Sequence, residues 1–199
     1  NAIKLIDAEL DDYSCDNEIN FENKKQINEA KKYFLLASKC LERDFDCLIT
    51  NYSKAIEINS EYAVAYVNRG IAYKNKGNHK KAIEDYTKAI ELKPEYAVAY
   101  NYRANSYYYL GFYEEAIKNY SKAIKLKPDY SDAFNSRASV YAFLKNYEEA
   151  IRDYTKAIEL NPSDPVFYKN RAKVYEKLGM KKQALKDIKI AEELIWKTF

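Results

Sequence analysis

Several residue types are scarce in this sequence of 199 residues, which has four glycines, four prolines, three cysteines and one histidine. No run of about 18 apolar residues occurs, so we expect no membrane-spanning helix. Neither sign of charge dominates, because the net charge is only +3. This balance does not favour nucleic acid or an anionic membrane as a partner.

The few chemically reactive side chains form no recognisable motif. Cys15, Cys40 and Cys47 are odd in number and lack CxxC spacing, so we expect free thiols and neither a disulfide framework nor a zinc site. Free thiols favour a reducing compartment, and no signal-peptide pattern is visible, so we expect a cytoplasmic protein. The only histidine, His79, has no predicted catalytic partner, and the glycines are too scattered for a phosphate-binding loop. We therefore expect no enzyme, no metal site and no cofactor.

What the sequence does contain is a pattern with a period of 34 residues. Residues 63–96, 97–130 and 131–164 share it almost position for position, and residues 165–198 share it more loosely. A fixed period of this length is the sequence sign of a helical solenoid. The shared positions hold an aromatic residue (Tyr66, Tyr100, Phe134, Tyr168), an arginine (Arg69, Arg103, Arg137, Arg171), a small residue (Gly70, Ala104, Ala138, Ala172), two alanines (Ala82 and Ala89 in the first copy) and a tyrosine between them (Tyr86, Tyr120, Tyr154).

Each copy reads as two amphipathic helices joined by a tight turn. Tyr66, Gly70 and Tyr73 follow helical spacing in the first half, and the alanines and tyrosine do so in the second. Gly or Asn between the halves tolerates the left-handed backbone that ends a helix. Each arginine lies sixteen residues before a polar residue on the second helix. This spacing predicts a hydrogen-bonded pair that fixes how the two helices pack. The alternative is that the arginines form an anion-binding row. These partners are Asp85, Asn119, Asp153 and Asp187.

The large aromatic, small residue, tyrosine, paired alanines and final proline (Pro94, Pro128, Pro162) resemble the tetratricopeptide repeat family. The resemblance implies an all-α, right-handed superhelical solenoid of helix–turn–helix repeats. It covers residues 63–198 strongly, and residues 29–62 read as a degenerate first repeat within a repeat domain of residues 29–199. Residues 1–28 carry seven acidic and three basic side chains, and we expect them to be an acidic leader or a capping helix.

In this family the first helix of each repeat lines a concave groove. Carried over by position, the resemblance implies a surface rich in asparagine and aromatic residues that becomes basic toward the C-terminus. Asparagine amides can both donate and accept hydrogen bonds, which suits a peptide backbone. The candidate peptide-binding residues are Asn68, Asn101, Tyr102, Asn105, Tyr109, Asn135, Phe143, Lys169, Asn170 and Lys173.

We therefore expect a protein-protein interaction module that binds an extended peptide or partner protein. The alternatives are a structural scaffold that self-associates through its terminal repeat faces and a non-catalytic arm of a larger protein. We expect the chain to be a monomer or a weak end-to-end oligomer. RNA binding, as in the related pentatricopeptide repeats, is disfavoured by the 34-residue period and the modest charge. The carboxylate clamp of chaperone-binding members is also disfavoured, because Val98 and Tyr102 occupy its two basic positions.

Overall fold

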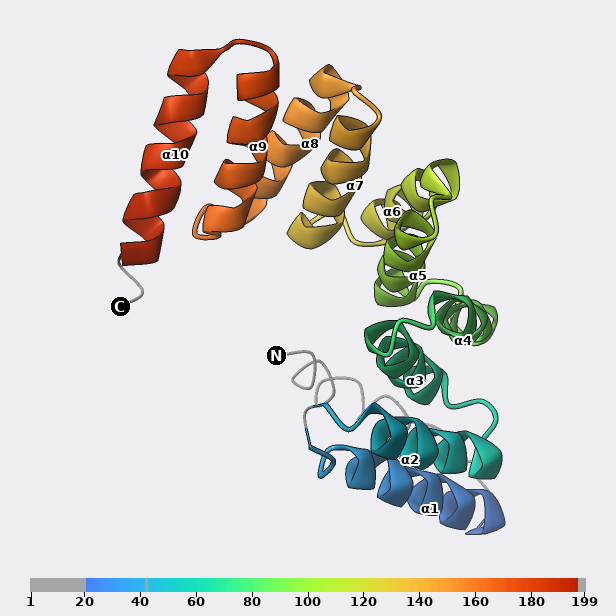
Figure 1. The fold of residues 1–199 in the computed structure, drawn as a ribbon. Helices are drawn as coiled ribbons and strands as arrows, with labels where there is room; N and C mark the ends of the chain where they lie inside the picture. Colours follow the sequence, from blue (N-terminus) through green and yellow to red (C-terminus); the bar gives the residue numbers. More distant parts are fainter. Residues whose placement is uncertain (1–20, 42, 197–199) are drawn as a thin grey trace. The chain divides into compact units, whose positions relative to one another are not determined.

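The computed structural model describes residues 21–41 and 43–196, which form ten α-helices and no β-strand (Figure 1). The chain divides into two compact units, residues 1–92 and residues 93–199. The first unit contains α1 (Phe21–Ala37), α2 (Phe45–Ile58), α3 (Ala63–Asn75) and α4 (His79–Leu92). The second contains α5 (Ala97–Tyr109), α6 (Tyr113–Leu126), α7 (Ser131–Phe143), α8 (Tyr147–Leu160), α9 (Pro165–Lys177) and α10 (Lys181–Trp196).

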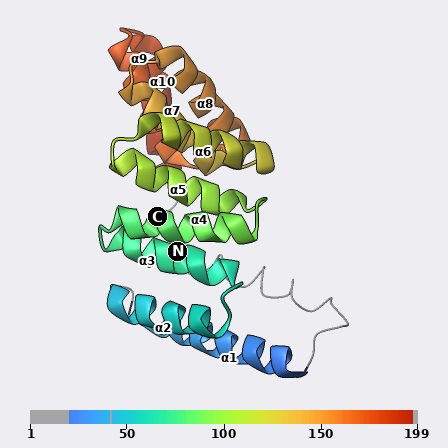
Figure 2. The same cartoon turned by 90° about the vertical axis from the view of Figure 1, so that its right-hand side faces the viewer.

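Helices that follow one another in the chain pack in pairs. In the first unit α1 pairs with α2 and α3 with α4, and α2 also contacts α3 (Figure 2). In the second unit the pairs are α5 with α6, α7 with α8 and α9 with α10, and each pair contacts the next. This arrangement confirms the predicted all-α solenoid of helix–turn–helix repeats.

The turns within the four helix pairs from α3 to α10 use a left-handed residue, which is the predicted glycine in three of them. Gly111 has a φ of +83°, and the backbone N–H of Phe112 donates to the carbonyl oxygen of Tyr107 at 2.9 Å. This bond satisfies a carbonyl group that the end of α5 leaves open. The turn between α7 and α8 lacks the glycine, and there Lys145 adopts a φ of +64°. A residue with a Cβ atom is less favourable in this conformation, so the packed helices on either side hold the turn in place.

Small residues let the two helices of a repeat approach closely. In the second unit, Ala104 of α5 and Ala116 of α6 pack with Tyr120, and all three are at most 2% exposed. Val140 of α7 completes this cluster, so the core of one repeat is closed by the next repeat. The following repeat builds the same kind of cluster from Ala138, Ala150, Tyr154 and Val174.

The predicted pairs between an arginine on the first helix and its partner on the second are confirmed. Nε and Nη2 of Arg137 donate to the two carboxylate oxygens of Asp153 at 2.7 and 2.9 Å. Nη1 donates to the hydroxyl of Ser121 at 2.8 Å, so a single guanidinium joins α6, α7 and α8. The other pairs are Arg69 with Asp85, Arg171 with Asp187, and Arg103 with the neutral Asn119.

The first helix pair builds its core from large aromatic rings. The ring of Phe34 lies 5.3 Å from that of Tyr52 and 5.2 Å from that of Tyr62, measured between centroids. This pair contains the predicted degenerate repeat of residues 29–62, and its first helix begins earlier, at Phe21. Most of the predicted leader, residues 1–20, lies outside the described residues.

The expectation of free thiols is wrong for two of the three cysteines. Cys40 and Cys47 form a disulfide, with their Cα atoms 5.9 Å apart. The segment between α1 and α2 turns back on itself and brings Cys40 against the first turn of α2, a pairing that cysteine spacing alone does not reveal. Disulfides are rare in reducing compartments, so the thiol-based argument for a cytoplasmic location no longer holds. Cys15 lies outside the described residues.

The close approach of α5 and α6 predicts that enlarging Ala116 destabilises the fold. Ala116 is fully buried against Ala104 and Tyr120, and a phenylalanine there has no space without moving a helix. We expect Ala116→Phe to lower the free energy of unfolding by about 1–3 kcal/mol, measured by urea denaturation followed by circular dichroism. Arg152→Phe, at an exposed position of α8, is the control and should change stability by less than about 0.5 kcal/mol. Equal losses in the two variants would contradict the packing argument.

Candidate peptide-binding surface

The first helices of the three repeats in the second unit, α5, α7 and α9, lie next to one another, because α5 contacts α7 and α7 contacts α9. Nine of the ten predicted groove residues belong to these helices, and we call the face that they predict the first-helix surface. The tenth, Asn68, belongs to the first unit, where its amide donates to the carbonyl oxygen of Val64 at 2.9 Å. The nine residues are Asn101, Tyr102, Asn105, Tyr109, Asn135, Phe143, Lys169, Asn170 and Lys173.

An aromatic cluster of Tyr108, Tyr109, Tyr113 and Phe143 lies where α5 and α7 end. The ring centroids of Tyr113 and Phe143 are 4.7 Å apart, and Tyr108 lies 5.8 Å from Tyr109 and 6.4 Å from Phe143. Tyr109 is nevertheless 69% exposed and Phe143 57% exposed. Two large rings are thus held by half-buried neighbours while facing solvent, a geometry that suits contact with an apolar side chain.

Tyr113 belongs to this cluster, although it was not among the predicted groove residues. Tyr113 is the first residue of α6 and follows the turn through Gly111 and Phe112. That turn folds α6 back along α5 and brings the Tyr113 ring within 5.8 Å of the Tyr108 ring. A sequence signal existed, because an aromatic residue directly after a tight turn lies close to the end of the preceding helix.

Three of the predicted asparagines are held by other side chains. The hydroxyl of Tyr120 donates to Oδ1 of Asn105 at 2.5 Å, and Nδ2 of Asn170 donates to Oδ1 of Asn135 at 3.0 Å. The second bond joins α9 to α7. All three asparagines are half-buried, and each amide has further donor or acceptor capacity beyond the bond described. The contacts therefore fix the orientation of the amides.

Asn101 differs from the prediction, because its side chain is buried and only 5% exposed. It lies near the hydroxyl of Tyr130, the residue that precedes α7. Asn101 therefore supports the contact between α5 and α7 and is not displayed on the surface. The position of Asn101 in the helix predicted that it faces the groove. The loop that leads into α7 covers its side chain.

Two half-buried tyrosines, Tyr102 and Tyr130, border the same surface. Burial raises the pKa of Tyr102 above its ordinary value, and the negative charge of Asp132 raises it further. Burial also raises the pKa of Tyr130, against the opposing effect of the neighbouring Asn101 amide. Both hydroxyls are consequently protonated at neutral pH and can donate hydrogen bonds.

The α9 side of the surface is basic. Lys169 and Lys173 are exposed and lie one helical turn apart, so they share a face of α9. Asn170, which bonds to α7, is adjacent to Lys169 and ties this helix to its neighbour. Two ammonium groups so placed suit a carboxylate ligand.

The part of the chain that the structure describes includes no group of three or more His, Cys, Asp or Glu side chains placed to hold a metal ion. His79 is half-buried at the start of α4, where burial and the nearby Lys74 lower its pKa. No helix within the described ranges has the length and apolar character that a membrane crossing requires.

Paired helices, a shared core pattern and a surface built from successive first helices define a helical-repeat protein. Family models described as tetratricopeptide repeat match residues 63–96, 131–164 and 153–186, and one described as TPR repeat matches residues 104–145. The chain belongs to the tetratricopeptide repeat family. No curated protein matches the chain.

Several solved structures have the same fold. MamA is 25% identical and superimposes with a TM-score of 0.71, over 90% of this chain and 97% of MamA. PilF of Pseudomonas aeruginosa is 22% identical with a TM-score of 0.77, over 85% of this chain and 78% of PilF. YrrB, described as a TPR protein with an unusual peptide-binding site, is 22% identical with a TM-score of 0.67, over 87% of this chain and 88% of YrrB.

The buried hydroxyl of Tyr120 predicts a loss of stability at high pH. Burial raises the pKa of Tyr120 in the folded state, so its contribution to stability is complete below about pH 10, the value of an unfolded tyrosine, and is lost as the pH rises through the folded-state pKa. We expect the free energy of unfolding to fall above about pH 10, and to fall less in Tyr120→Phe. Urea denaturation at several pH values measures this slope.

A slope in Tyr120→Phe that equals the slope of the unmodified chain would show that burial of the Tyr120 hydroxyl is not the cause.

Proposed function

We propose that this chain is a protein-interaction module that binds an extended peptide segment of a partner on the first-helix surface of its second unit, and that it acts by binding and not by catalysis. The observation that carries the proposal is the pair of exposed rings, Tyr109 and Phe143, on the same run of helices as the exposed Lys169 and Lys173. The solved YrrB protein, with the same fold, is described as having a peptide-binding site.

The chemistry of the surface indicates what kind of segment it binds. Exposed aromatic rings at the ends of α5 and α7 suit an apolar side chain, because covering them removes apolar area from water. The lysines of α9 suit an acidic side chain or a terminal carboxylate. Asn105, Asn135 and Asn170 lie on the same three helices, and their oriented amides suit a peptide backbone, at about 0.5–1.5 kcal/mol for each hydrogen bond. We therefore infer a segment with separate apolar and acidic anchors.

Selection from a displayed peptide library, followed by fluorescence anisotropy with the purified peptides, tests this proposal. We expect peptides with an apolar residue and an acidic residue to be enriched. Tyr109→Ser combined with Phe143→Ser should weaken binding by at least about tenfold, as expected for aromatic anchors that become buried when the peptide binds. Lys169→Glu combined with Lys173→Glu should weaken the binding of acidic peptides by a similar factor.

Matched controls come from α10, which is outside the first-helix surface. Leu185→Ser removes an apolar side chain that is 66% exposed, and Lys186→Glu combined with Lys189→Glu makes the same change of charge on exposed lysines. Neither should change peptide affinity. Binding that is lost in the α10 variants and retained in the α5, α7 and α9 variants would overturn the proposal, as would a selection that enriches no peptide.

A second candidate function, self-association as a scaffold, is favoured by the exposed apolar residues of α10. Leu185 is 66% exposed and Trp196 is 78% exposed on this helix, which packs against α9. We expect the mass measured by sedimentation to rise with concentration, and Leu185→Lys to suppress that rise. Gln183→Lys adds the same charge at another exposed position of α10, and the mass of this variant should still rise with concentration. A mass that is independent of concentration would reject this candidate.

A further inference from the structure

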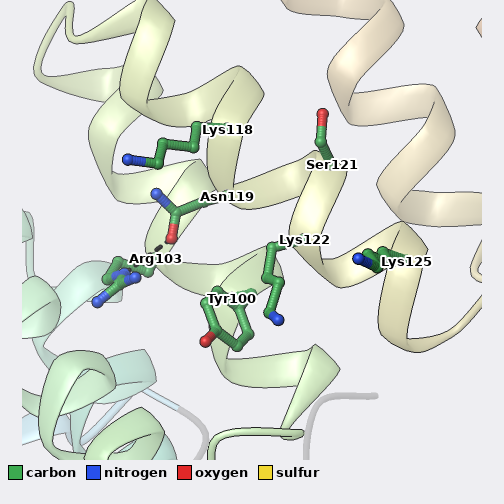
Figure 3. Close-up of a pocket in the computed structure, with 7 residues that line it drawn as sticks. All are labelled: Tyr100, Arg103, Lys118, Asn119, Ser121, Lys122 and Lys125. Atoms are coloured by element: carbon green, nitrogen blue, oxygen red, sulfur yellow. Dashed lines mark hydrogen bonds between the residues drawn. The ribbon is translucent and has the colours of Figure 1, made fainter.

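A cavity of about 440 Å³ lies beside α5 and α6 in the second unit (Figure 3). Four of its lining residues are cationic, Arg103 of α5 and Lys118, Lys122 and Lys125 of α6. Tyr100 and Asn119 contribute further to the wall, and none of the lining residues is acidic. We call this cavity the α5–α6 pocket.

One source of the positive charge is a change at a position that carries a carboxylate elsewhere in the repeats. Asp85, Asp153 and Asp187 each accept two hydrogen bonds from the arginine of their own repeat. The equivalent residue in the α5–α6 repeat is Asn119, whose Oδ1 accepts from Nε of Arg103 at 2.8 Å (Figure 3). The Asn119 amide nitrogen donates to the carbonyl oxygen of Glu115, so it does not replace the missing carboxylate oxygen. The guanidinium thus faces a neutral partner on α6.

A second sequence difference, about two turns further along α6, also makes the pocket more positive. In α4, Lys88 pairs with Glu91 at 3.1 Å, and in α8 Lys156 pairs with Glu159 at 3.0 Å. The equivalent residue of α6 is Lys125, so Lys122 has a second lysine where its counterparts have a glutamate. Both carboxylates that compensate charge in the neighbouring copies are therefore absent from the α6 positions that line the pocket.

The contents of the pocket fit an anion. The guanidinium of Arg103 and the ammonium of Lys122 lie 5.4 and 6.0 Å from the ring centroid of Tyr100, which brings these two positive charges to the same ring. Burial lowers the pKa of Arg103, in contrast to Arg137, whose pKa is raised by the hydrogen bond and charge of Asp153 despite its burial. Like charges gathered in this way repel one another, and an anion that enters removes the repulsion.

The α5–α6 pocket is separate from the first-helix surface. Successive side chains of an α-helix are rotated by about 100° around its axis. Tyr100 and Arg103 therefore lie on the opposite side of α5 from Asn105 and Tyr109. An anion in the pocket and a peptide on the first-helix surface would thus occupy different faces of the same helix.

We propose that the α5–α6 pocket binds a phosphate group. A phosphate monoester carries close to two negative charges and three acceptor oxygens, which matches several cationic donors better than the single charge of a carboxylate. Arginine suits such a ligand because its planar fork of N–H groups binds two oxygens at once. The phosphate belongs either to a small molecule or to a phosphorylated side chain of a partner.

Isothermal titration of the full chain at low salt tests the proposal with two probes. The first is inorganic pyrophosphate, and the second is a short phosphoserine peptide, with its unphosphorylated form as a blank. Saturable binding of pyrophosphate as tight as that of the peptide indicates a small-molecule source, and tighter binding of the phosphopeptide indicates a partner's side chain. The absence of saturable binding by both probes would overturn the proposal.

The decisive variant is Asn119→Asp, which restores the residue found in the other three pairs. We expect it to weaken phosphate binding by at least about tenfold, because it places a negative charge beside Arg103 at the edge of the pocket. Its melting temperature should equal or exceed that of the unmodified chain, so lost binding is not a sign of unfolding. Undiminished binding in Asn119→Asp would overturn the assignment.

A matched pair of lysine variants gives an independent check that does not depend on that position. Lys122→Gln removes an exposed charge that lines the pocket, and Lys156→Gln removes the equivalent charge from α8. We expect only Lys122→Gln to weaken binding, by several fold. Equal weakening in both variants would show that the probes respond to the overall charge of the chain, and would overturn the proposal.

Discussion

The contact between a small residue and a tyrosine ring governs how the two helices pack in the three repeats of residues 63–164. At Gly70 the constraint is most severe, because a Cβ atom built there would lie 2.6 Å from Cε1 of Tyr86. The equivalent Ala104 and Ala138 have that atom and are fully buried in clusters with Tyr120 and Tyr154. Close packing of this kind makes the core intolerant of added volume, so the helix pair has a fixed geometry.

The fixed helix pairs determine which side chains remain for recognition. Tyrosines on the second helices extend through the pair and bond to residues of the first helices, as Tyr120 does with Asn105 and Tyr154 with Ser139. The residues that face a partner are thereby oriented from within the core. Positions that neither the core nor these bonds require, such as Tyr109 and Phe143, are where the chain presents exposed aromatic area.

The repeat period was sufficient to predict the helix pairs, the left-handed turns and the arginine pairs, because each depends on contacts within one copy of the pattern. Contacts that depend on a loop or a neighbouring copy were not predicted. Tyr130 covers Asn101 from the loop before α7, and a turn between α1 and α2 brings Cys40 to Cys47. The cationic character of the α5–α6 pocket also required the structure, because Asn119 and Lys125 are unremarkable until the partners of their counterparts are known.

The arginines have a mechanical consequence in the second unit. Arg137 bonds to Ser121 of the preceding repeat and Arg171 to Thr155 of the preceding repeat, so these bonds run between adjacent repeats. A chain whose contacts are made only with nearest neighbours loses its structure one module at a time. Under tension applied at its C-terminal end, this unit would lengthen in steps of a helix pair and behave as an extensible tether.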